Sequence, residues 1–155
     1  MNIQMIVHSQ TGNTLNVASA LLAAIEPINP DIKLTHVEAS NEREMDPNKL
    51  SIGNLPDCSN ADILVLGGPV RGANASPAIL KTIATLEPLQ GKKCVVFTTE
   101  FFPFDWMGGR RAVTMMEQAL IARGATVATH AIIHWKRRDR TKQIDQFITA
   151  FKALM

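Results

Sequence analysis

The chain has 155 residues, about the length of one ordinary domain, so we expect residues 1–155 to form a single domain. Hydrophobic residues make up 46% and charged residues 19% of the chain, which excludes a disordered, collagen-like or coiled-coil protein. A formal net charge of +2 gives no reason to expect a nucleic-acid partner. No apolar run approaches the ~20 residues that span a bilayer, and the N-terminus lacks a basic region followed by a cleavage site, so we expect a cytoplasmic protein without a membrane partner.

Short apolar runs rich in β-forming residues alternate with longer stretches of helical periodicity, and Gly, Pro and Asn separate them. In the first half of the chain, this pattern predicts strands at 3–8 and 32–38 and a helix at 13–25. The polar stretch 39–61 contains two prolines and a glycine, which limit any helix there to a turn or two around 48–52.

The second half of the chain continues this alternation. A continuous apolar run at 63–66 predicts a strand that helices bury on both faces. Ser76 and Pro77 have the residue types of an N-cap and a first helical position. The remaining predicted elements are strands at 93–99 and 126–133 and helices at 109–123 and 139–154. Five strands alternating with helices favour an α/β fold with a doubly wound parallel sheet, because right-handed crossovers place helices on both of its faces.

Residue types that act as nucleophiles or metal ligands show no motif spacing. The two cysteines lie far apart in the sequence, Cys94 within a predicted core strand and Cys58 in a polar loop where it can be exposed. No histidine has a recognisable acid or nucleophile partner, so we interpret all four as structural. The sequence therefore predicts no metal site, no disulfide framework and no catalytic residue.

The segment from Ser9 to Thr14, between the first predicted strand and helix, is suited to binding an anion. Its glycine and hydroxyl residues can leave backbone N–H groups free, and the helix dipole adds positive potential. In an open α/β sheet, ligands bind beyond the carboxyl ends of the strands, where strand order reverses. An ordinary turn with Thr11 or Asn13 as the helix N-cap is the alternative. A Walker A loop is excluded because Gly-Lys-Ser/Thr is missing, and without G-x-G-x-x-G a nicotinamide dinucleotide has no support.

The pattern Ser9-x-Thr11-Gly12-Asn13-Thr14 resembles the phosphate loop of the flavodoxins, which bind the phosphate of FMN. The stretch 62–70 is similar to their third strand and the loop beside the flavin, and 91–99 and 108–127 are similar to their fourth strand and fourth helix. The resemblance implies a flavodoxin-like, five-stranded parallel sheet in the order 2-1-3-4-5. It also implies that FMN is bound without a covalent link.

Carried over residue by residue, the resemblance places three segments around FMN. Hydroxyls and backbone amides of 9–14 contact the phosphate. The loop 69–74 lines one edge of the ring, with the Gly72 carbonyl near flavin N5, and the loop 99–108 lines the other side. The expected cofactor-binding residues are Ser9, Gln10, Thr11, Gly12, Asn13, Thr14, Pro69, Val70, Arg71, Gly72, Asn74, Thr99, Glu100, Phe101, Phe102, Trp106 and Gly108.

The sequence departs from the flavodoxin pattern in its aromatic residues. Flavodoxins commonly place a tyrosine and a tryptophan against the flavin, whereas this chain contains no tyrosine and has Arg71 before Gly72. Three phenylalanines and one tryptophan fall within 101–106, and we predict that Trp106 is the stacking ring. For the three phenylalanines, a hydrophobic plug over the sheet end or a homodimer contact is the alternative.

The charge also departs from the pattern, because flavodoxin electron carriers are acidic around the flavin. Arg71, Arg110 and Arg111 are expected near the site, where positive charge favours the reduced, anionic flavin. A second basic cluster at 136–142 follows the last predicted strand. It is either a solvated face or a docking site for an acidic partner protein or a nucleotide phosphate.

These patterns favour an FMN-binding, flavodoxin-like redox protein that transfers electrons to or from a partner protein or a small molecule. An electron carrier ranks before an FMN-dependent oxidoreductase, such as an NAD(P)H-dependent flavin or quinone reductase, because no nicotinamide motif is visible. The alternative from another class is a flavodoxin-fold module that lacks flavin and acts in protein interaction.

Overall fold

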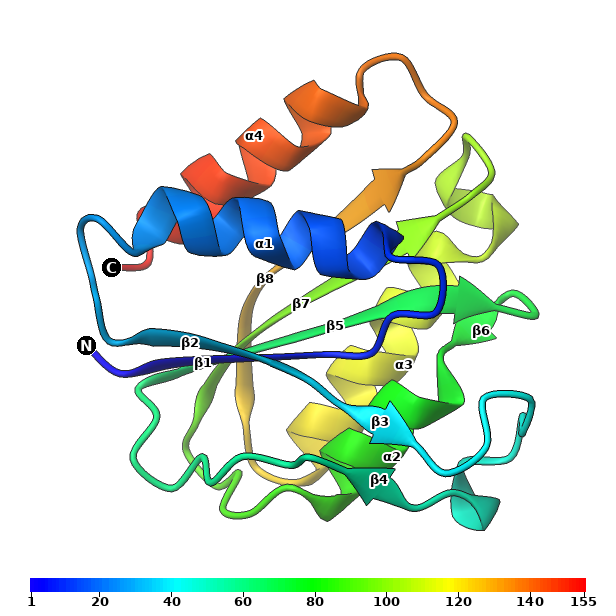
Figure 1. Cartoon of the computed structure of the whole chain (residues 1–155), viewed down its shortest axis with the longest axis horizontal. Coiled ribbons are helices and arrows are strands. Elements are labelled where there is room, and N and C mark those ends of the chain that lie inside the picture. Colours follow the sequence, from blue (N-terminus) through cyan, green and yellow to red (C-terminus); the bar gives the residue numbers. More distant parts are fainter.

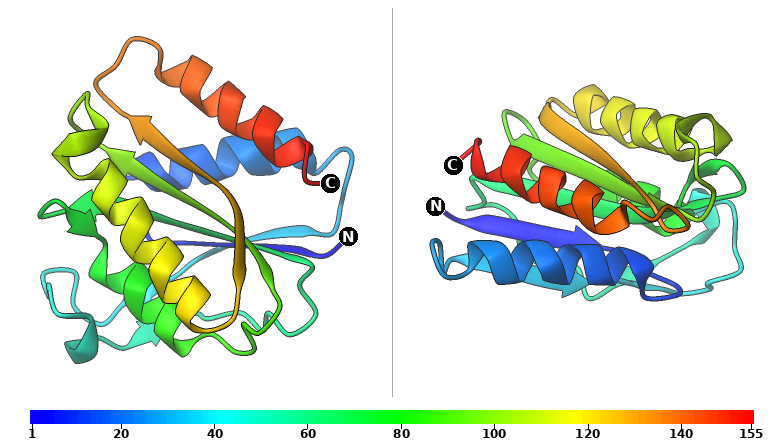
Figure 2. Two further views of the ribbon diagram at one scale, coloured as in Figure 1. Left: turned by 180° about the vertical axis from the view of Figure 1, so that it is seen from behind. Right: turned by 90° about the horizontal axis from the view of Figure 1, so that it is seen from above.

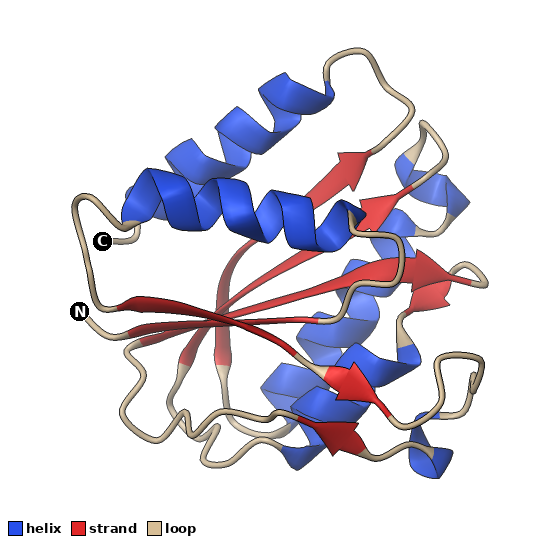
Figure 3. Cartoon of the chain, in the orientation of Figure 1, coloured by secondary structure: helices blue, strands red, loops and turns tan.

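A computed structural model describes residues 1–155. Five parallel strands form one twisted sheet in the order β2-β1-β5-β7-β8 (Figures 1 and 3). These strands are β1 (Ile3–Val7), β2 (Ile32–His36), β5 (Ile63–Arg71), β7 (Lys93–Glu100) and β8 (Thr126–His134). Counted along the chain, this is the 2-1-3-4-5 order that the sequence predicts.

Two helices cover each face of the sheet (Figure 2). The helices are α1 (Asn13–Ile25), α2 (Pro77–Thr85), α3 (Gly109–Ala122) and α4 (Arg140–Lys152). Alternate residues of each central strand point to opposite faces, so Val65 packs with α1 and α4 while Leu66 packs with α2 and α3. Each face therefore has its own apolar core, and the sheet is buried on both sides. None of the four helices is both long enough and apolar enough to cross a membrane.

Short elements extend the loops at one edge of the sheet. They are β3 (Glu38–Ala39), the 3-10 helix η1 (Pro47–Lys49), β4 (Ile52–Gly53), β6 (Asn74–Ala75) and the 3-10 helix η2 (Asp105–Met107). Strands β3 and β4 pair with each other, and β6 folds back antiparallel to the end of β5. The polar stretch 39–61 thus contributes a small ribbon beside the main sheet rather than another layer.

The predicted strands and helices are confirmed to within two residues at their ends, except that β5 is longer than expected. Helix α1 has the predicted bounds, and the Ser76 hydroxyl caps α2 by accepting a hydrogen bond from the Ile79 backbone N–H at 3.4 Å. Strand β5 continues beyond the apolar run 63–66 through two glycines. A Cβ at Gly67 would overlap the Phe97 ring of β7. The glycine is needed for this close approach and does not end the strand.

The polar loop does not expose Cys58, which is 1% exposed. The polar loop carrying it folds back onto the α2 and α3 face, where Cys58 joins the same apolar cluster as Cys94. Burial raises the pKa of Cys58 to about 11 and the pKa of Cys94 to about 12. Both thiols therefore stay protonated and unreactive at neutral pH.

Candidate functional site

The carboxyl ends of β1, β5 and β7 meet at one edge of the sheet, and the loops that follow them surround a small cavity. Its volume is about 150 Å³. Its lining residues are Gln10, Thr11, Asn13, Pro69, Val70, Thr99, Glu100 and Phe101. The structure thus brings together residues from all three predicted segments. Strand order reverses beside this cavity, because β1 lies between β2 and β5.

The turn between β1 and α1 is shaped by Ser9, whose hydroxyl oxygen accepts hydrogen bonds from the backbone N–H of Gly12 at 3.1 Å and of Leu15 at 3.3 Å. Gly12 is the helix N-cap and has a φ of 93°, in the left-handed region that favours glycine, so neither Thr11 nor Asn13 caps the helix. Four backbone N–H groups of this turn have no hydrogen-bond partner in the protein, those of Gln10, Thr11, Asn13 and Thr14. Free N–H groups at a helix N-terminus are suited to binding an anion.

The hydroxyl residues of this turn fall into two groups. The Thr14 Oγ1 lies 2.7 Å from the Thr99 Oγ1 in a buried contact that ties α1 to the end of β7. Ser9 is likewise occupied within the turn, whereas Thr11 lines the cavity. Of the three hydroxyls predicted to contact phosphate, Thr11 is therefore the one that the structure places at the cavity wall.

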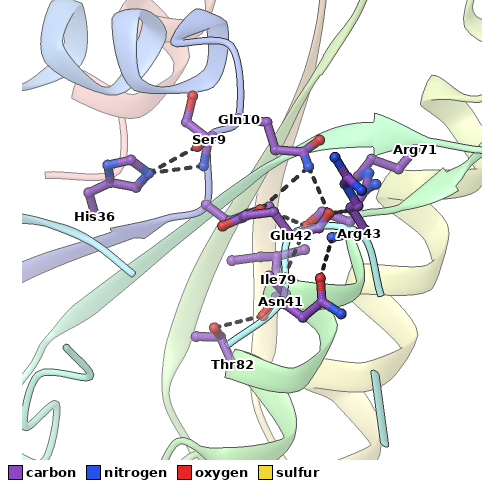
Figure 4. A network of polar contacts seen from close by, with 12 residues as sticks. Ser9, Gln10, His36, Asn41, Glu42, Arg43, Arg71, Ile79 and Thr82 are labelled. Atoms are coloured by element: carbon purple, nitrogen blue, oxygen red, sulfur yellow. Dashed lines mark hydrogen bonds and ion pairs between the residues drawn. The ribbon is translucent and has the colours of Figure 1, made fainter. Parts of the chain in front are cut away.

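A network of polar contacts fastens the loop 40–46 against this edge (Figure 4). Gln10 Nε2 donates to the backbone carbonyl of Glu42 at 3.1 Å, and Arg71 Nη1 donates to the same carbonyl at 2.8 Å. Arg71 was expected beside the flavin, but its guanidinium points toward Glu42 and does not line the cavity. The positive charge of Arg71 therefore serves first to hold this loop.

His8 follows β1 and is fully buried, and both of its ring nitrogens contact polar side chains. Nδ1 lies 2.6 Å from Ser76 Oγ, and Nε2 lies 2.8 Å from Glu42 Oε2. A carboxylate can only accept, so Nε2 carries the proton and donates to Glu42, and the Ser76 O–H donates to Nδ1. Burial lowers the pKa of His8 below its ordinary value.

Serine, histidine and glutamate are the residue types of a hydrolytic triad, but their arrangement here is different. In such a triad the acid orients Nδ1 and the nucleophile faces Nε2, whereas Ser76 and Glu42 occupy the exchanged positions. Ser76 is also fully buried and caps α2, so no substrate can reach it. The cluster is structural, although the prediction that no histidine has an acid partner is wrong. Glu42 lies 34 residues from His8, in a stretch without strong sequence signals.

The turn between β5 and β6 consists of Gly72 and Ala73, which have φ values of 55° and 61°. Two successive positive φ values are typical of a type I′ hairpin turn. Gly108 packs against this hairpin, since a Cβ there would lie 2.7 Å from Val70 Cγ1. Gly108 therefore contacts the hairpin that contains Gly72 and Asn74, and none of these three residues lines the cavity.

The loop between β7 and α3 exposes a group of aromatic side chains at the same edge. These are Phe101, Phe102, Phe104 and Trp106. Trp106 is 73% exposed and stacks on Phe104, with ring centroids 5.9 Å apart. It lines a different hollow, of about 470 Å³, together with Arg110 and Arg111. Phe101 is the ring of this group that lines the smaller cavity, so the structure does not bring Trp106 to the turn 9–14.

The basic cluster 136–142 is partly engaged within the protein. Arg137 pairs with Asp139 through contacts of 3.0 Å and 2.9 Å. Arg140 donates to the Trp135 carbonyl at 2.9 Å and lies over the Trp135 ring. Two of the three arginines in the cluster therefore stabilise the loop between β8 and α4.

A further polar cluster joins the ends of β7 and β8 to η2. His134 Nε2 lies 2.6 Å from Asp105 Oδ1 and 3.5 Å from Glu100 Oε2. Glu100 is 2% exposed, and neither of its carboxylate oxygens has a well-aligned hydrogen bond, although the Gly109 backbone N–H approaches them. Burial raises the pKa of Glu100 above its ordinary value. Sequence reasoning named Glu100 but missed the cluster, which depends on the strand register that sets Glu100 opposite His134.

Comparison with solved structures identifies the fold. The chain matches flavodoxin 2 from Bacillus cereus with a TM-score of 0.69 and 18% identity, covering 100% of both chains. It matches a Megasphaera elsdenii flavodoxin with a TM-score of 0.65 and 20% identity, covering 96% of this chain and 98% of that one. A flavoprotein in complex with FMN from Lactobacillus acidophilus matches with a TM-score of 0.66 and 15% identity, over 94% and 97% of the two chains. No sequence-family model and no curated protein matches the chain. The structural matches show that the fold is flavodoxin-like, which confirms the predicted fold class.

Proposed function

We propose that the protein binds FMN at the carboxyl edge of its sheet and transfers electrons between partners. The observation that carries this proposal is the set of four unpartnered N–H groups in the turn 10–14, at the point where strand order reverses. One of the solved structures that share the fold is a flavoprotein in complex with FMN, which supports the choice of cofactor.

The residues of this edge fit the phosphate end of FMN. A Cβ at Gly12 would meet no atom within 4 Å, so the turn leaves open space beside its free amides. Thr11 and Asn13 add a hydroxyl and a side-chain amide at the cavity wall. The cavity of about 150 Å³ is smaller than the roughly 300–1,000 Å³ of typical small-molecule sites. It is therefore assigned to the phosphate end, and the flavin ring is assigned to the neighbouring surface.

The exposed aromatic side chains of 101–106 offer apolar surface for that ring. Such a concentration of exposed rings marks a ligand site or a partner site. Phe101 shares the wall of the phosphate cavity, which makes it the first candidate for contact with the flavin, ahead of Trp106. The loops 69–74 and 99–108 complete the proposed site. When bound, FMN supplies the electron-transfer chemistry, and the protein supplies binding, orientation and electrostatics.

A flavodoxin-fold module that lacks flavin and acts in protein interaction is the second candidate. The observation that favours it is the same exposed aromatic loop in a chain without tyrosine. In this case a partner protein, rather than a flavin, covers the four rings.

Titration of the purified protein with FMN and with riboflavin, followed by flavin fluorescence, tests the proposal. We expect saturable FMN binding and at least tenfold weaker riboflavin binding, because only FMN carries a phosphate for the free amides. Equal affinities would show that the turn does not bind phosphate. Absence of binding to both flavins would favour the interaction module. For the electron-transfer step, we expect the photoreduced complex to be reoxidised by an added one-electron acceptor.

A further inference from the structure

The cluster of Glu100, Asp105 and His134 has the donor atoms of a metal site. One ligand atom from each residue lies within 4.8 Å of the others. Glu100 borders the proposed phosphate cavity, whereas neither Asp105 nor His134 lines it. The cluster therefore needs an explanation of its own.

The hydrogen bonds behind His134 determine which ring nitrogen is free. Gln143 Nε2 donates to Asp139 Oδ1 at 2.8 Å, so the amide oxygen of Gln143 is the atom that faces His134. This oxygen accepts from the His134 backbone N–H at 2.9 Å and lies 3.1 Å from Nδ1. Nδ1 therefore carries a proton and donates it. Nε2 is then the ring nitrogen on the side of the two carboxylates, Glu100 and Asp105.

The orientation of the acidic groups points to a shared ligand. No hydrogen bond joins His134 Nε2 to either carboxylate, despite its 2.6 Å separation from Asp105 Oδ1. Both oxygens of Glu100 are buried without a well-aligned hydrogen bond, although the backbone N–H of Gly109, at the start of α3, approaches this carboxylate. An unpaired buried carboxylate is costly, and a bound cation removes this cost. Atoms that bind one metal ion point at a common centre rather than at one another.

We propose that Glu100, Asp105 and His134 bind one divalent metal ion of the zinc class. One imidazole nitrogen and two carboxylate oxygens are ligands that Zn²⁺ accepts at about 2.0–2.2 Å, which separates neighbouring ligand atoms by about 3.4 Å. The 3.5 Å between Glu100 and His134 matches this spacing. Asp105, which is half-exposed in η2, moves outward by about 1 Å to match it as well. Mg²⁺ fits less well, because it prefers oxygen ligands in octahedral geometry.

The surroundings supply an outer shell and access for the ion. Gln143 fixes the ring of His134, and Asp139 fixes Gln143, as outer-shell groups do in metal sites. Asp105 and His134 line a hollow of about 310 Å³, through which an ion and a water ligand reach the cluster. Arg137 lines the same hollow, but its guanidinium is paired with Asp139.

Isothermal titration of the purified full chain with ZnCl₂, after EDTA treatment and dialysis, tests this site. We expect one tight equivalent of Zn²⁺ and at least tenfold weaker binding of MgCl₂. Asp105→Asn changes a half-exposed side chain and leaves the core intact, and it is expected to weaken Zn²⁺ binding at least tenfold. Glu100→Gln is expected to do the same, and Gln143→Leu to weaken binding by about 10–100-fold. Circular dichroism checks that each variant is folded.

His130→Gln is the matched control. His130 Nδ1 lies 2.8 Å from Glu117 Oε1, which makes a second, more exposed histidine–carboxylate pair, at the wall of the same hollow but without a third ligand. We expect this variant to bind Zn²⁺ as the wild type does. The proposal is overturned if the wild type binds no Zn²⁺, if Asp105→Asn binds it equally well, or if His130→Gln loses as much affinity as Asp105→Asn. If Glu100→Gln does not fold, the Zn²⁺ affinity of Asp105→Asn decides the test. The titration contains no flavin, so its outcome is independent of the FMN proposal.

Discussion

His8 and His134 lie at the same edge of the sheet, both are buried, and both face carboxylates, yet their surroundings differ. Both nitrogens of His8 have hydrogen-bond partners, in Ser76 and Glu42. His134 has Gln143 on one side only, and on the other side Nε2 and the Glu100 oxygens are unpartnered. Buried polar groups in native proteins are rarely left unpaired without a role. The two clusters contain similar residue types. What distinguishes the structural cluster around His8 from the candidate ligand site around His134 is whether the buried polar atoms have hydrogen-bond partners.

The largest expected effect comes from His8→Ala, which removes the shared partner of Ser76 and Glu42. We expect the free energy of unfolding to fall by about 2–3 kcal/mol, because the buried Ser76 hydroxyl loses its acceptor and a cavity remains. Urea denaturation measures this change. His130→Ala, at an exposed ring, is expected to cost less than about 0.5 kcal/mol. A similar loss of unfolding free energy in both variants would show that the buried contacts of His8 contribute no more to stability than the surface contact of His130.

Thr11 and Thr14 form a second pair of like residues in different surroundings, because Thr11 lines the cavity while Thr14 makes a buried contact with Thr99. Thr11→Ala removes a hydroxyl at the cavity wall, and we expect about tenfold weaker FMN binding with little change for riboflavin. Thr14→Ala removes the buried contact with Thr99, so its main effect should be a loss of about 1 kcal/mol in stability. FMN titration and urea denaturation of both variants separate the two roles. A reversed pattern would assign the phosphate contact to Thr14.

Two conservative glutamate substitutions should change stability in opposite directions. In EDTA, Glu100→Gln is expected to raise the free energy of unfolding by about 1 kcal/mol, because it neutralises a buried, unpartnered carboxylate. Glu42→Gln weakens a charge-assisted hydrogen bond from His8 and is expected to lower it by about 0.5–1 kcal/mol. Paired urea titrations measure both values. A loss in Glu100→Gln would mean that this carboxylate is already stabilised in the metal-free protein.

The smallest expected effect is a pH dependence from His8. Burial lowers the pKa of His8 below its ordinary value of 6.5, so the unfolded chain takes up a proton there more readily than the folded chain. The stability that neutral His8 contributes is present above pH 6.5 and declines as the pH falls below it. Urea denaturation between about pH 5 and 7.5 should show this decline, and His8→Gln should reduce it. An unchanged slope in that variant would assign the decline to another group.

The turn 9–14 shows how far the candidate site could be predicted. Its residue types and its place after the first strand identified it, because a turn and a helix start depend on neighbouring residues. Which of its hydroxyls stay free could not be predicted in this way. Ser9 is engaged within the turn itself, whereas Thr14 contacts Thr99 of β7, and this second contact exists only once the sheet has formed.

The sequence by itself determined the alternation of strands and helices, the cap of α2 and the apolar faces of the central strands. These features follow from local periodicity and local hydrogen bonding. The tertiary structure alone decided that Cys58 is buried, that Arg71 holds the loop 40–46, and that Trp106 lies away from the cavity beside the turn 9–14.

The contacts of His8 and His134 show the physical reason for this division. Glu42 lies beside His8 because the polar loop 40–46 folds over the end of β1. Glu100 lies beside His134 because the register of β7 against β8 sets the two residues opposite each other. Strand register and loop paths depend on packing between segments that are distant along the chain, so no local pattern contains them. The partners of a buried side chain, and with them its role, are therefore decided only when the chain folds.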